Sequence, residues 1–290
     1  EKKLKPNQVC LTFDDGIKCQ YDIALPVLED LKIQSFFFIY SSTLEGVPDM
    51  LEVYRFFRMN FFNNIDEFYK EFFKHVNTNL EIFFKDQKKI IKDSQIKFPF
   101  YSTNDIKFRL IRDQLLSAND YDLIMLKMFD EAKFNPVDYY KYLFINSKEL
   151  NLIKDLNHLI GLHSHSHPTI SLDVGKNRAK SGIESLTYEN QLAEYEKNVS
   201  ILSRELKVGR GYFKYMSHPC GSYNEDTLKI LKKLGIELGF KQIMHIEKNK
   251  GMTKVNNSFL EIAREDHSKI MRIMKWKLHY LPQIKNDIFI

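Results

Sequence analysis

The chain opens with a short run of strand-forming residues, 9–13, that stops abruptly at a polar Asp-Asp-Gly sequence. Apolar residues then recur at helical spacing over residues 21–31, which predicts a helix after a polar loop. The next apolar run, residues 35–40, is continuous at its centre, as is typical of a strand covered on both faces in a parallel sheet. The opening pattern therefore predicts a βαβ unit.

From residue 42 to residue 154 the pattern changes to long, aromatic-rich helical stretches, with Phe57, Phe61, Phe68 and Phe72 at helical spacing. We interpret residues 42–154 as a helical insertion, or cap, between the second strand and the later motifs. Aromatic residues at this spacing usually pack a helical core, so we favour packing inside the insertion over a surface that stacks on carbohydrate.

Alternating strands and helices return after the insertion. The expected strands are residues 159–163, 211–217, 239–244 and 259–264, and the expected helices are residues 185–206, 224–234 and 267–276. Repeating β and α units of this kind predict a parallel α/β sheet or barrel. No repeat, low-complexity tract or linker divides the chain, so the sequence predicts a single domain over residues 1–290.

The composition narrows the classes of protein that fit. With 290 residues, 43% of them hydrophobic, the chain can bury a substantial core. The net charge of +5 comes from lysines spread beside nearly as many acids, so no basic stripe predicts nucleic-acid binding. Three separated cysteines argue against a disulfide framework. Neither an export signal nor a membrane-spanning run is visible, which favours a cytoplasmic location.

The first polar cluster is the sequence T-F-D-D-G at residues 12–16, directly after the first predicted strand. Active sites of parallel barrels gather at the carboxyl ends of strands, so Asp14 and Asp15 are candidates for a site. One carboxylate of such a pair can hold a metal ion while its neighbour faces substrate, and Gly16 allows the tight turn. The alternative is that either aspartate only caps the following helix.

The second cluster places three imidazoles, His163, His165 and His167, after another predicted strand. His163 and His167 can converge on one ion, because neutral imidazole is a standard zinc ligand. Two histidines and one carboxylate leave coordination positions open for water and substrate, as a hydrolytic site requires. With a second, free carboxylate the set suits hydrolysis of an amide or an ester.

The T-F-D-D-G motif and the later H-S-H-S-H motif at residues 163–167 together resemble the motifs of the polysaccharide deacetylases. These form the NodB-like superfamily, carbohydrate esterase family four. The resemblance implies an α/β fold, a distorted (β/α) barrel of about seven strands, here carrying the helical insertion. It also implies a hydrolase that removes an N-acyl group, normally acetyl, from an amino sugar or sugar conjugate in surface-glycan metabolism.

The same resemblance implies roles for individual residues. Asp14 would be the general base, while Asp15, His163 and His167 would hold one divalent metal ion. Zinc is the expected ion, and cobalt, nickel or manganese would also fit this set of donors. His165 has no fixed role in the family, and we expect it either to be structural or to support the metal ligands without binding the ion.

A third cluster, residues 217–224, is similar to the family's R-x-P-[YF]-G stretch on the wall of the substrate groove. Pro219 and Gly221 match this pattern, and we expect them and Tyr223 to contact substrate. The cluster departs from the family in having Ser217 in place of the arginine and Cys220 in place of the aromatic residue. The usual partner of the catalytic base is therefore missing from its expected place.

Arg264, at the end of the predicted strand 259–264, is a candidate to replace that arginine. An arginine beside Asp14 would keep the carboxylate ionised and hold it by paired hydrogen bonds. The alternative for Arg264 is a surface salt bridge with the two acidic residues that follow it.

The general acid is less defined, because the family's late L-x-x-H motif has no convincing copy in this chain. His218, His245, His267 and His279 all compete for the role. We favour His267, which lies at a predicted strand-to-helix junction beside Asp266.

Two other functions remain open. One is a deformylase or small-amide amidohydrolase with the same metal centre. The other is a catalytically silent sugar-binding member, which the missing motifs permit but the intact Asp14 argues against. The long insertion would narrow the entrance to the site, so we expect a small or chain-end substrate rather than an internal unit of a polymer.

Overall fold

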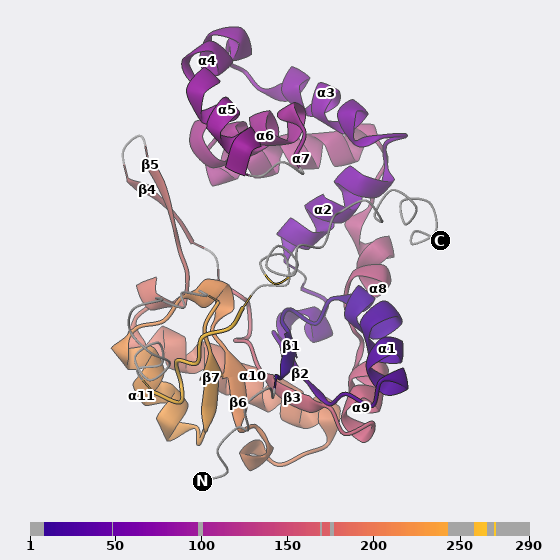
Figure 1. Cartoon of the computed structure of the whole chain (residues 1–290), viewed down its shortest axis with the longest axis vertical. Coiled ribbons are helices and arrows are strands. Elements are labelled where there is room, and N and C mark those ends of the chain that lie inside the picture. The colour runs from indigo at the N-terminus through magenta and orange to yellow at the C-terminus, as the bar shows by residue number, and fades with distance from the viewer. Residues whose placement is uncertain are drawn as a thin grey trace.

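A parallel five-stranded sheet forms the base of the molecule (Figure 1). The structure is a computed structural model, and it describes residues 9–47, 49–97, 101–168, 170–174, 177–242, 258–265 and 270. The strand order is β1-β2-β3-β6-β7. These strands are β1 (Leu11–Phe13), β2 (Ser35–Ile39), β3 (Leu159–Leu162), β6 (Tyr215–Ser217) and β7 (Leu238–Phe240). The predicted α/β barrel-like fold is confirmed as a curled half-barrel, although within the described residues its parallel sheet has five strands rather than about seven.

Helices flank this sheet and bury it. They are α1 (Leu25–Asp30), which follows a π-helical turn η1 (Gln20–Ala24), α9 (Ser147–Asp155), α10 (Tyr188–Leu206) and α11 (Glu225–Lys233). On β2 the neighbouring side chains Phe37 and Phe38 point to opposite faces and are both fully buried. The continuous apolar run of β2 thus reflects a strand that is covered on both faces.

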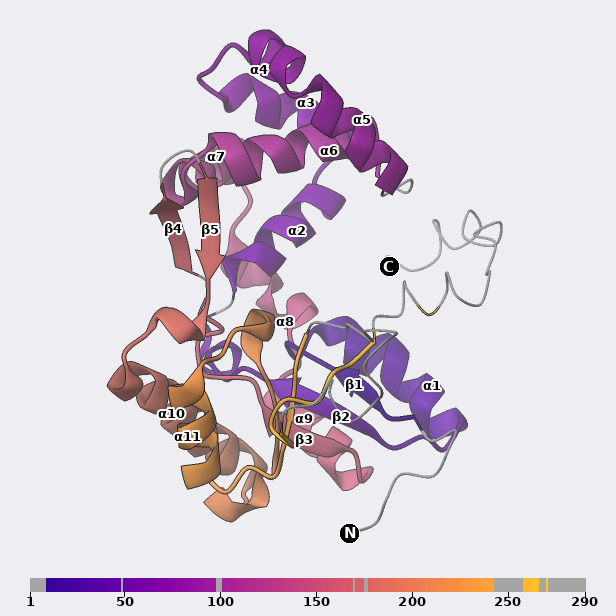
Figure 2. The same ribbon diagram turned by 60° about the vertical axis from the view of Figure 1, so that its left-hand side comes forward.

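The segment between β2 and α9 forms a separate helical body beyond one end of the sheet (Figures 1 and 2). Its helices are α2 (Met50–Asn60), α3 (Ile65–His75), α4 (Leu80–Asp86), α5 (Lys88–Lys97), α6 (Thr103–Leu110), α7 (Ala118–Glu131) and α8 (Tyr140–Leu143). Short turns η2 (Ser42–Glu45), η3 (Ile111–Leu115) and η4 (Pro136–Tyr139) connect them. Among the described residues, no helix is both long enough and apolar enough to span a membrane.

This helical body has an aromatic core of its own. Phe57, Phe68 and Phe72 are completely buried and pack in one cluster with Phe108. Their burial favours the expectation that these aromatics pack the insertion and do not face a carbohydrate. By contrast, α9 packs on the sheet through Leu150 and Ile153, although it falls within the predicted insertion 42–154. The boundaries of the insertion, and the single domain over residues 1–290, stay predictions.

Both ends of the helical body are hydrogen-bonded to the loops that carry the two sequence motifs. At its start, the Ser42 amide donates to the backbone oxygen of His165 at 2.9 Å, and the Ser41 hydroxyl lies 3.0 Å from His165 Nδ1. At its end, the Ile145 amide donates to the backbone oxygen of Gly16 at 2.9 Å. His165 therefore contacts the entrance of the insertion.

The chain after the insertion departs from the predicted elements in three places. The predicted strand 211–217 begins as a 3-10 turn, η6 (Arg210–Tyr212), and only its last three residues form β6. The predicted strand 259–264 is wrong: residues 258–261 turn, and Ile262 makes a single parallel bridge to Phe240. A hairpin of β4 (Ile170–Val174) and β5 (Asn177–Ser181) was not predicted.

Residues 258–261 turn because Ser258 bonds locally: its backbone oxygen accepts from the Glu261 amide at 3.1 Å and its hydroxyl accepts from the Leu260 amide at 3.3 Å. The backbone of this turn packs closely against β7. A Cβ atom on Gly239 would lie 2.5 Å from the backbone oxygen of Leu260, so only glycine permits this approach. Of the predicted strand 239–244, residues 239 and 240 lie in β7, residues 241 and 242 are not in a strand, and residues 243 and 244 lie outside the described residues. The predicted helix 267–276 lies outside them except for residue 270.

Gly161, in the middle of β3, has no space for a side chain. A Cβ there would lie 2.5 Å from Phe38 Cδ1 and 2.8 Å from the backbone oxygen of Tyr215. Because a backbone oxygen in the sheet cannot move away as a flexible side chain could, we expect Gly161→Ala to lower the free energy of unfolding by about 1–3 kcal/mol. Gly211→Ala is the matched control, since its Cβ would meet no atom within 4 Å. Urea unfolding compares the two, and a Gly161→Ala protein as stable as the control would contradict this packing.

Candidate active site

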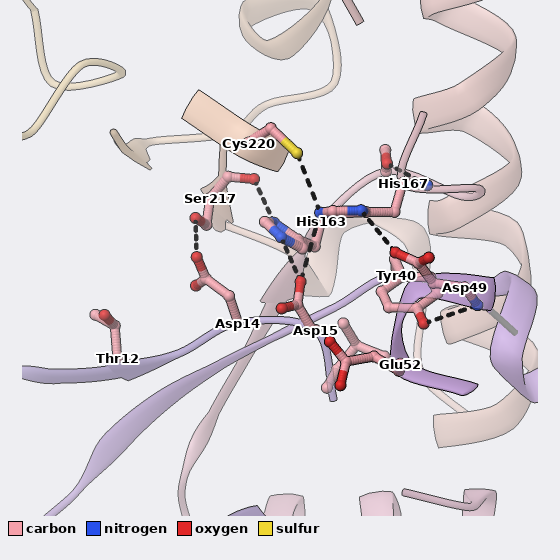
Figure 3. Close-up of polar contacts among 12 residues, drawn as sticks. Thr12, Asp14, Asp15, Tyr40, Asp49, Glu52, His163, His167, Ser217 and Cys220 are labelled. Carbon is pink, nitrogen blue, oxygen red and sulfur yellow. Dashed lines mark hydrogen bonds and ion pairs between the residues drawn. The ribbon is translucent and has the colours of Figure 1, made fainter. Parts of the chain in front are cut away.

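The loop after β1 directs its two aspartates to different neighbours. Asp15 and Gly16 both have left-handed backbone angles, with φ of 76° and 65°. In Figure 3 Asp14 points toward Ser217, whereas Asp15 points toward His163. The next helical turn starts at Gln20 with Cys19 at its N-cap position and no side-chain cap, so neither aspartate caps it.

Asp15 lies between two imidazoles. Its Oδ1 atom is 3.1 Å from His163 Nε2 and 3.5 Å from His167 Nε2. Ligand atoms of all three side chains lie within 4.8 Å of one another, and among the residues whose positions are described this is the group that could hold a metal ion. His167 has a left-handed φ of 51°, and its amide donates to the hydroxyl of Ser164 at 3.2 Å.

The tautomer of His163 tests whether these residues fit a metal. Its Nδ1 atom lies 2.8 Å from the backbone oxygen of Ser217. A carbonyl oxygen only accepts, so Nδ1 carries the proton and the neutral ring presents a lone pair at Nε2. That lone pair faces a carboxylate oxygen of Asp15, and two acceptors in contact repel unless a proton or a cation lies between them. The donor set therefore fits a divalent cation.

His167 has acidic or polarisable neighbours at both ring nitrogens. Nδ1 lies 3.5 Å from Asp49 Oδ2, and Nε2 lies 4.0 Å from Cys220 Sγ. Burial alone would lower the pKa of His167, but Asp49, Cys220 and Asp15 raise that pKa to about 10. Without a metal this imidazole is protonated at neutral pH, so a metal ion that binds Nε2 must displace a proton.

Asp14 is held by Arg264, which lies 250 residues further along the chain. Nη1 of Arg264 donates to Asp14 Oδ1 at 2.8 Å and Nη2 donates to Oδ2 at 2.7 Å, so the pairing is bidentate. Burial alone would raise the pKa of Asp14, but His163 and Arg264 outweigh burial and hold it below its ordinary value. Arg264 Nε donates to the backbone oxygen of Lys241 at 2.8 Å, which fixes the guanidinium plane.

Ser217 joins this pair from β6. Its hydroxyl donates to Asp14 Oδ2 at 3.0 Å and accepts from Arg264 Nη2 at 3.0 Å. Thr12 on β1 accepts a further hydrogen bond from Arg264 Nη1 at 3.1 Å. In the sequence Ser217 is noticeable only because it replaces the family's arginine. In the structure its small side chain contacts the guanidinium of Arg264, which comes from another segment of the chain.

The third cluster forms a 3-10 turn, η7 (Pro219–Gly221), beside the histidines. Cys220 and Gly221 have left-handed φ angles of 54° and 69°. Of this turn, Cys220 lies near His167, with its Sγ atom 4.0 Å from Nε2. Tyr223 has protein partners: its hydroxyl donates to Glu261 at 3.0 Å and its ring stacks on His218 at 4.3 Å. Contact of Pro219, Gly221 and Tyr223 with substrate stays a prediction.

The candidates for the general acid are only partly described. His218 is buried, and its Nε2 donates to the backbone oxygen of Leu260 at 2.8 Å. Burial lowers the pKa of His218 to about 4, so this ring is neutral at physiological pH and has no acidic proton to give. His267, the favoured acid, lies outside the described residues, as do His245 and His279.

The helical insertion contributes side chains that the sequence did not mark as site residues. Asp49 and Glu52, at the start of α2, lie beside Asp15 and His167 in Figure 3. Burial raises the pKa of Glu52, and the nearby carboxylates of Asp15 and Asp49 act in the same direction. Asp49 precedes a helical run, which predicts an N-cap but does not reveal a contact with a histidine motif far along the chain.

Truncating Arg264 would leave Asp14 partly buried without its counter-charge. Their side chains are 13% and 24% exposed, so we expect Arg264→Met to lower the free energy of unfolding of the metal-free protein. A loss of roughly 1.5–3 kcal/mol is typical of hydrogen bonds to charged groups. The control is Arg210→Met, which removes an ion pair to Glu196 with side chains 53% and 43% exposed. If urea unfolding gave equal losses of unfolding free energy for the two variants, the ion pair of Arg264 with Asp14 would be no stronger than the exposed pair of Arg210 with Glu196.

A family model described as polysaccharide deacetylase matches residues 1–55 and 124–239 of this chain. Residues 56–123, between the two matched ranges, belong to the insertion that the sequence predicts, and residues 240–290 also lie outside the match. No curated protein matches the sequence. Among solved structures, the chain resembles the deacetylase PplD of Streptococcus pyogenes, whose structure contains acetate. The two are 14% identical with a TM-score of 0.46 over 90% of this chain and 66% of that one.

Two further structures are similar. The deacetylase domain of BpsB from Bordetella bronchiseptica is 12% identical, with a TM-score of 0.48 over 90% of this chain and 72% of that one. IcaB from Ammonifex degensii is 12% identical, with a TM-score of 0.45 over 94% of this chain and 74% of that one. The family model covers more than half of the sequence. This chain therefore belongs to the polysaccharide deacetylase family.

Proposed function

We propose that the protein is a metal-dependent hydrolase that removes an N-acyl group, normally acetyl, from an amino sugar or a sugar conjugate in surface-glycan metabolism. The observation that supports this most is the pairing of two unlike carboxylates. Asp14 is neutralised by Arg264, while Asp15 faces two imidazoles that fit a cation. Membership of the polysaccharide deacetylase family supports a carbohydrate substrate.

In this proposal Asp15, His163 and His167 hold one divalent ion, which we expect to be zinc, with cobalt, nickel or manganese also suited to the donors. Such an ion, when bound, would polarise the acyl carbonyl, lower the pKa of a nearby water molecule and stabilise negative charge on the carbonyl oxygen. The backbone oxygen of Ser217 supports this role, because it holds His163 in the tautomer that a ligand requires.

Asp14 is the proposed general base. It takes a proton from the attacking water as the water oxygen bonds to the acyl carbon. Arg264 and Ser217 keep this carboxylate ionised and fix its direction, because together they donate to both of its oxygens. The C–N bond then breaks, and the amine leaves with a proton from a general acid. His267 stays our prediction for that acid. The products are acetate and a free amino sugar.

The insertion also bears on the size of the substrate. Helix α2 begins beside the proposed ligands, because Asp49 contacts His167 directly. A helical body attached this close restricts one side of the site. We propose that the enzyme acts on a small or chain-end amino sugar, such as a nucleotide- or lipid-linked one.

Mass spectrometry of N-acetylglucosamine oligomers after treatment with the enzyme should then show terminal deacetylation, whereas internal deacetylation along long chains would contradict the proposal.

Two substitutions separate metal binding from proton transfer. Asp14→Asn should keep the metal and lose activity by roughly 100- to 10,000-fold, the usual contribution of a general base. His163→Ala should lose both, because it removes a ligand. Zinc content and release of acid from acetylated amino sugars are the two measurements.

The control for this pair is His165→Gln, which alters the same motif at a residue that contacts Ser41. It should keep the metal. An active Asp14→Asn enzyme would contradict the assignment of the base.

Identification of the released acid tests the acyl group, since formate in place of acetate would make the enzyme a deformylase. Release of no acid by a metal-loaded protein would identify a silent sugar-binding member.

A further inference from the structure

Asp49 uses its two carboxylate oxygens for two different purposes. Oδ1 accepts a hydrogen bond from the Leu51 amide at 2.8 Å and so caps the N-terminus of α2. Oδ2 lies 3.5 Å from Nδ1 of His167. The side chains of Asp49 and His167 are 19% and 12% exposed, so this contact is largely shielded from water. One residue of the insertion therefore contacts both its own first helix and the histidine motif.

The opposite ring nitrogen of His167 points at the proposed metal position. Nε2 faces Asp15, while Nδ1 faces Asp49, as Figure 3 shows. Within the part of the chain that the structure describes, Nδ1 is buried and makes no hydrogen bond, and Asp49 Oδ2 is the acceptor that it faces. A modest rotation of either side chain would bring the 3.5 Å contact to hydrogen-bond length.

Tyr40 restrains the same arrangement from β2. Its hydroxyl accepts a hydrogen bond from the Asp49 amide at 3.3 Å, and its ring lies 5.4 Å from the ring of His167. Tyr40 itself is 1% exposed. The backbone of Asp49 and the ring of His167 are thus both held against one rigid side chain.

From these contacts we infer that Asp49 is a positioning residue for His167, and that it makes the helical insertion part of the metal centre. A carboxylate behind a ligating imidazole fixes the ring orientation and strengthens the metal–nitrogen bond. Here the carboxylate belongs to the N-cap of α2, so the position of that helix determines where His167 is held. The inference rests on the proposed function, because it assumes that His167 binds the metal.

Asp49→Asn separates the two roles of this side chain. Asparagine caps helices as well as aspartate, so the variant keeps the cap of α2 and removes only the charge behind His167. The amide cannot supply a negative charge behind His167, and we expect the Kd for Zn²⁺ to rise about 10- to 100-fold. The Kd is measured by competition with a chelator on the full chain. The visible absorption of the Co²⁺-loaded protein should change as well, because it reports the ligand geometry.

Two controls separate positioning from general effects. Asn64→Ala removes the cap of the next helix, where Asn64 accepts from the Glu67 amide at 3.0 Å, and should lower the melting temperature without changing the Kd for Zn²⁺. Glu71→Gln removes a carboxyl group of the insertion from its exposed ion pair with Lys74 on α3 and should change the Kd much less than Asp49→Asn.

The inference is overturned if Asp49→Asn binds Zn²⁺ as tightly as the native chain, or if either control weakens binding equally. His163→Ala distinguishes this failure from failure of the proposed function. If His163→Ala abolishes Zn²⁺ binding while Asp49→Asn leaves it intact, only the role of Asp49 is wrong. If His163→Ala still binds Zn²⁺ tightly, the proposed metal centre itself is wrong.

Discussion

The site depends on how two adjacent, partly buried carboxylates are neutralised. Asp14 and Asp15 repel each other, and each would be costly to bury without an opposite charge. The left-handed backbone at Asp15 sends them to different partners. Asp14 meets the guanidinium of Arg264, whereas Asp15 meets two imidazole nitrogens, a set of donors that could hold a cation. This division separates the proposed proton acceptor from the proposed metal ligand.

The parallel sheet brings these groups together because the carboxyl ends of its strands lie along one edge. Asp14 and Asp15 follow β1, His163 follows β3, and Ser217 ends β6. Arg264 comes from an irregular segment beside β7 that hydrogen-bonds to Lys241 through both backbone and guanidinium. The arginine thus arrives from outside the regular strands, and the small side chain of Ser217 leaves space for it.

The helical insertion is bonded to the site at three separate points. Its end pairs with the loop of the aspartates through Gly16, its start pairs with His165, and Asp49 faces His167. Because its aromatic core is separate from that of the sheet, it packs as a body of its own. Displacing that body would disturb both motif loops, since hydrogen bonds transmit the movement to them.

The family, the parallel α/β class and the two motifs can be read from the amino-acid order alone, because they depend on local patterns such as a strand followed by Asp-Asp-Gly. The sequence mispredicted the strand 259–264 and missed the hairpin β4–β5, whose bounds depend on packing and turn geometry. The contacts of Arg264 with Asp14 and of Asp49 with His167 are visible only in the folded chain. Those contacts join segments remote in sequence, and the distance between such segments is set by how the sheet and the insertion pack, which no local pattern records.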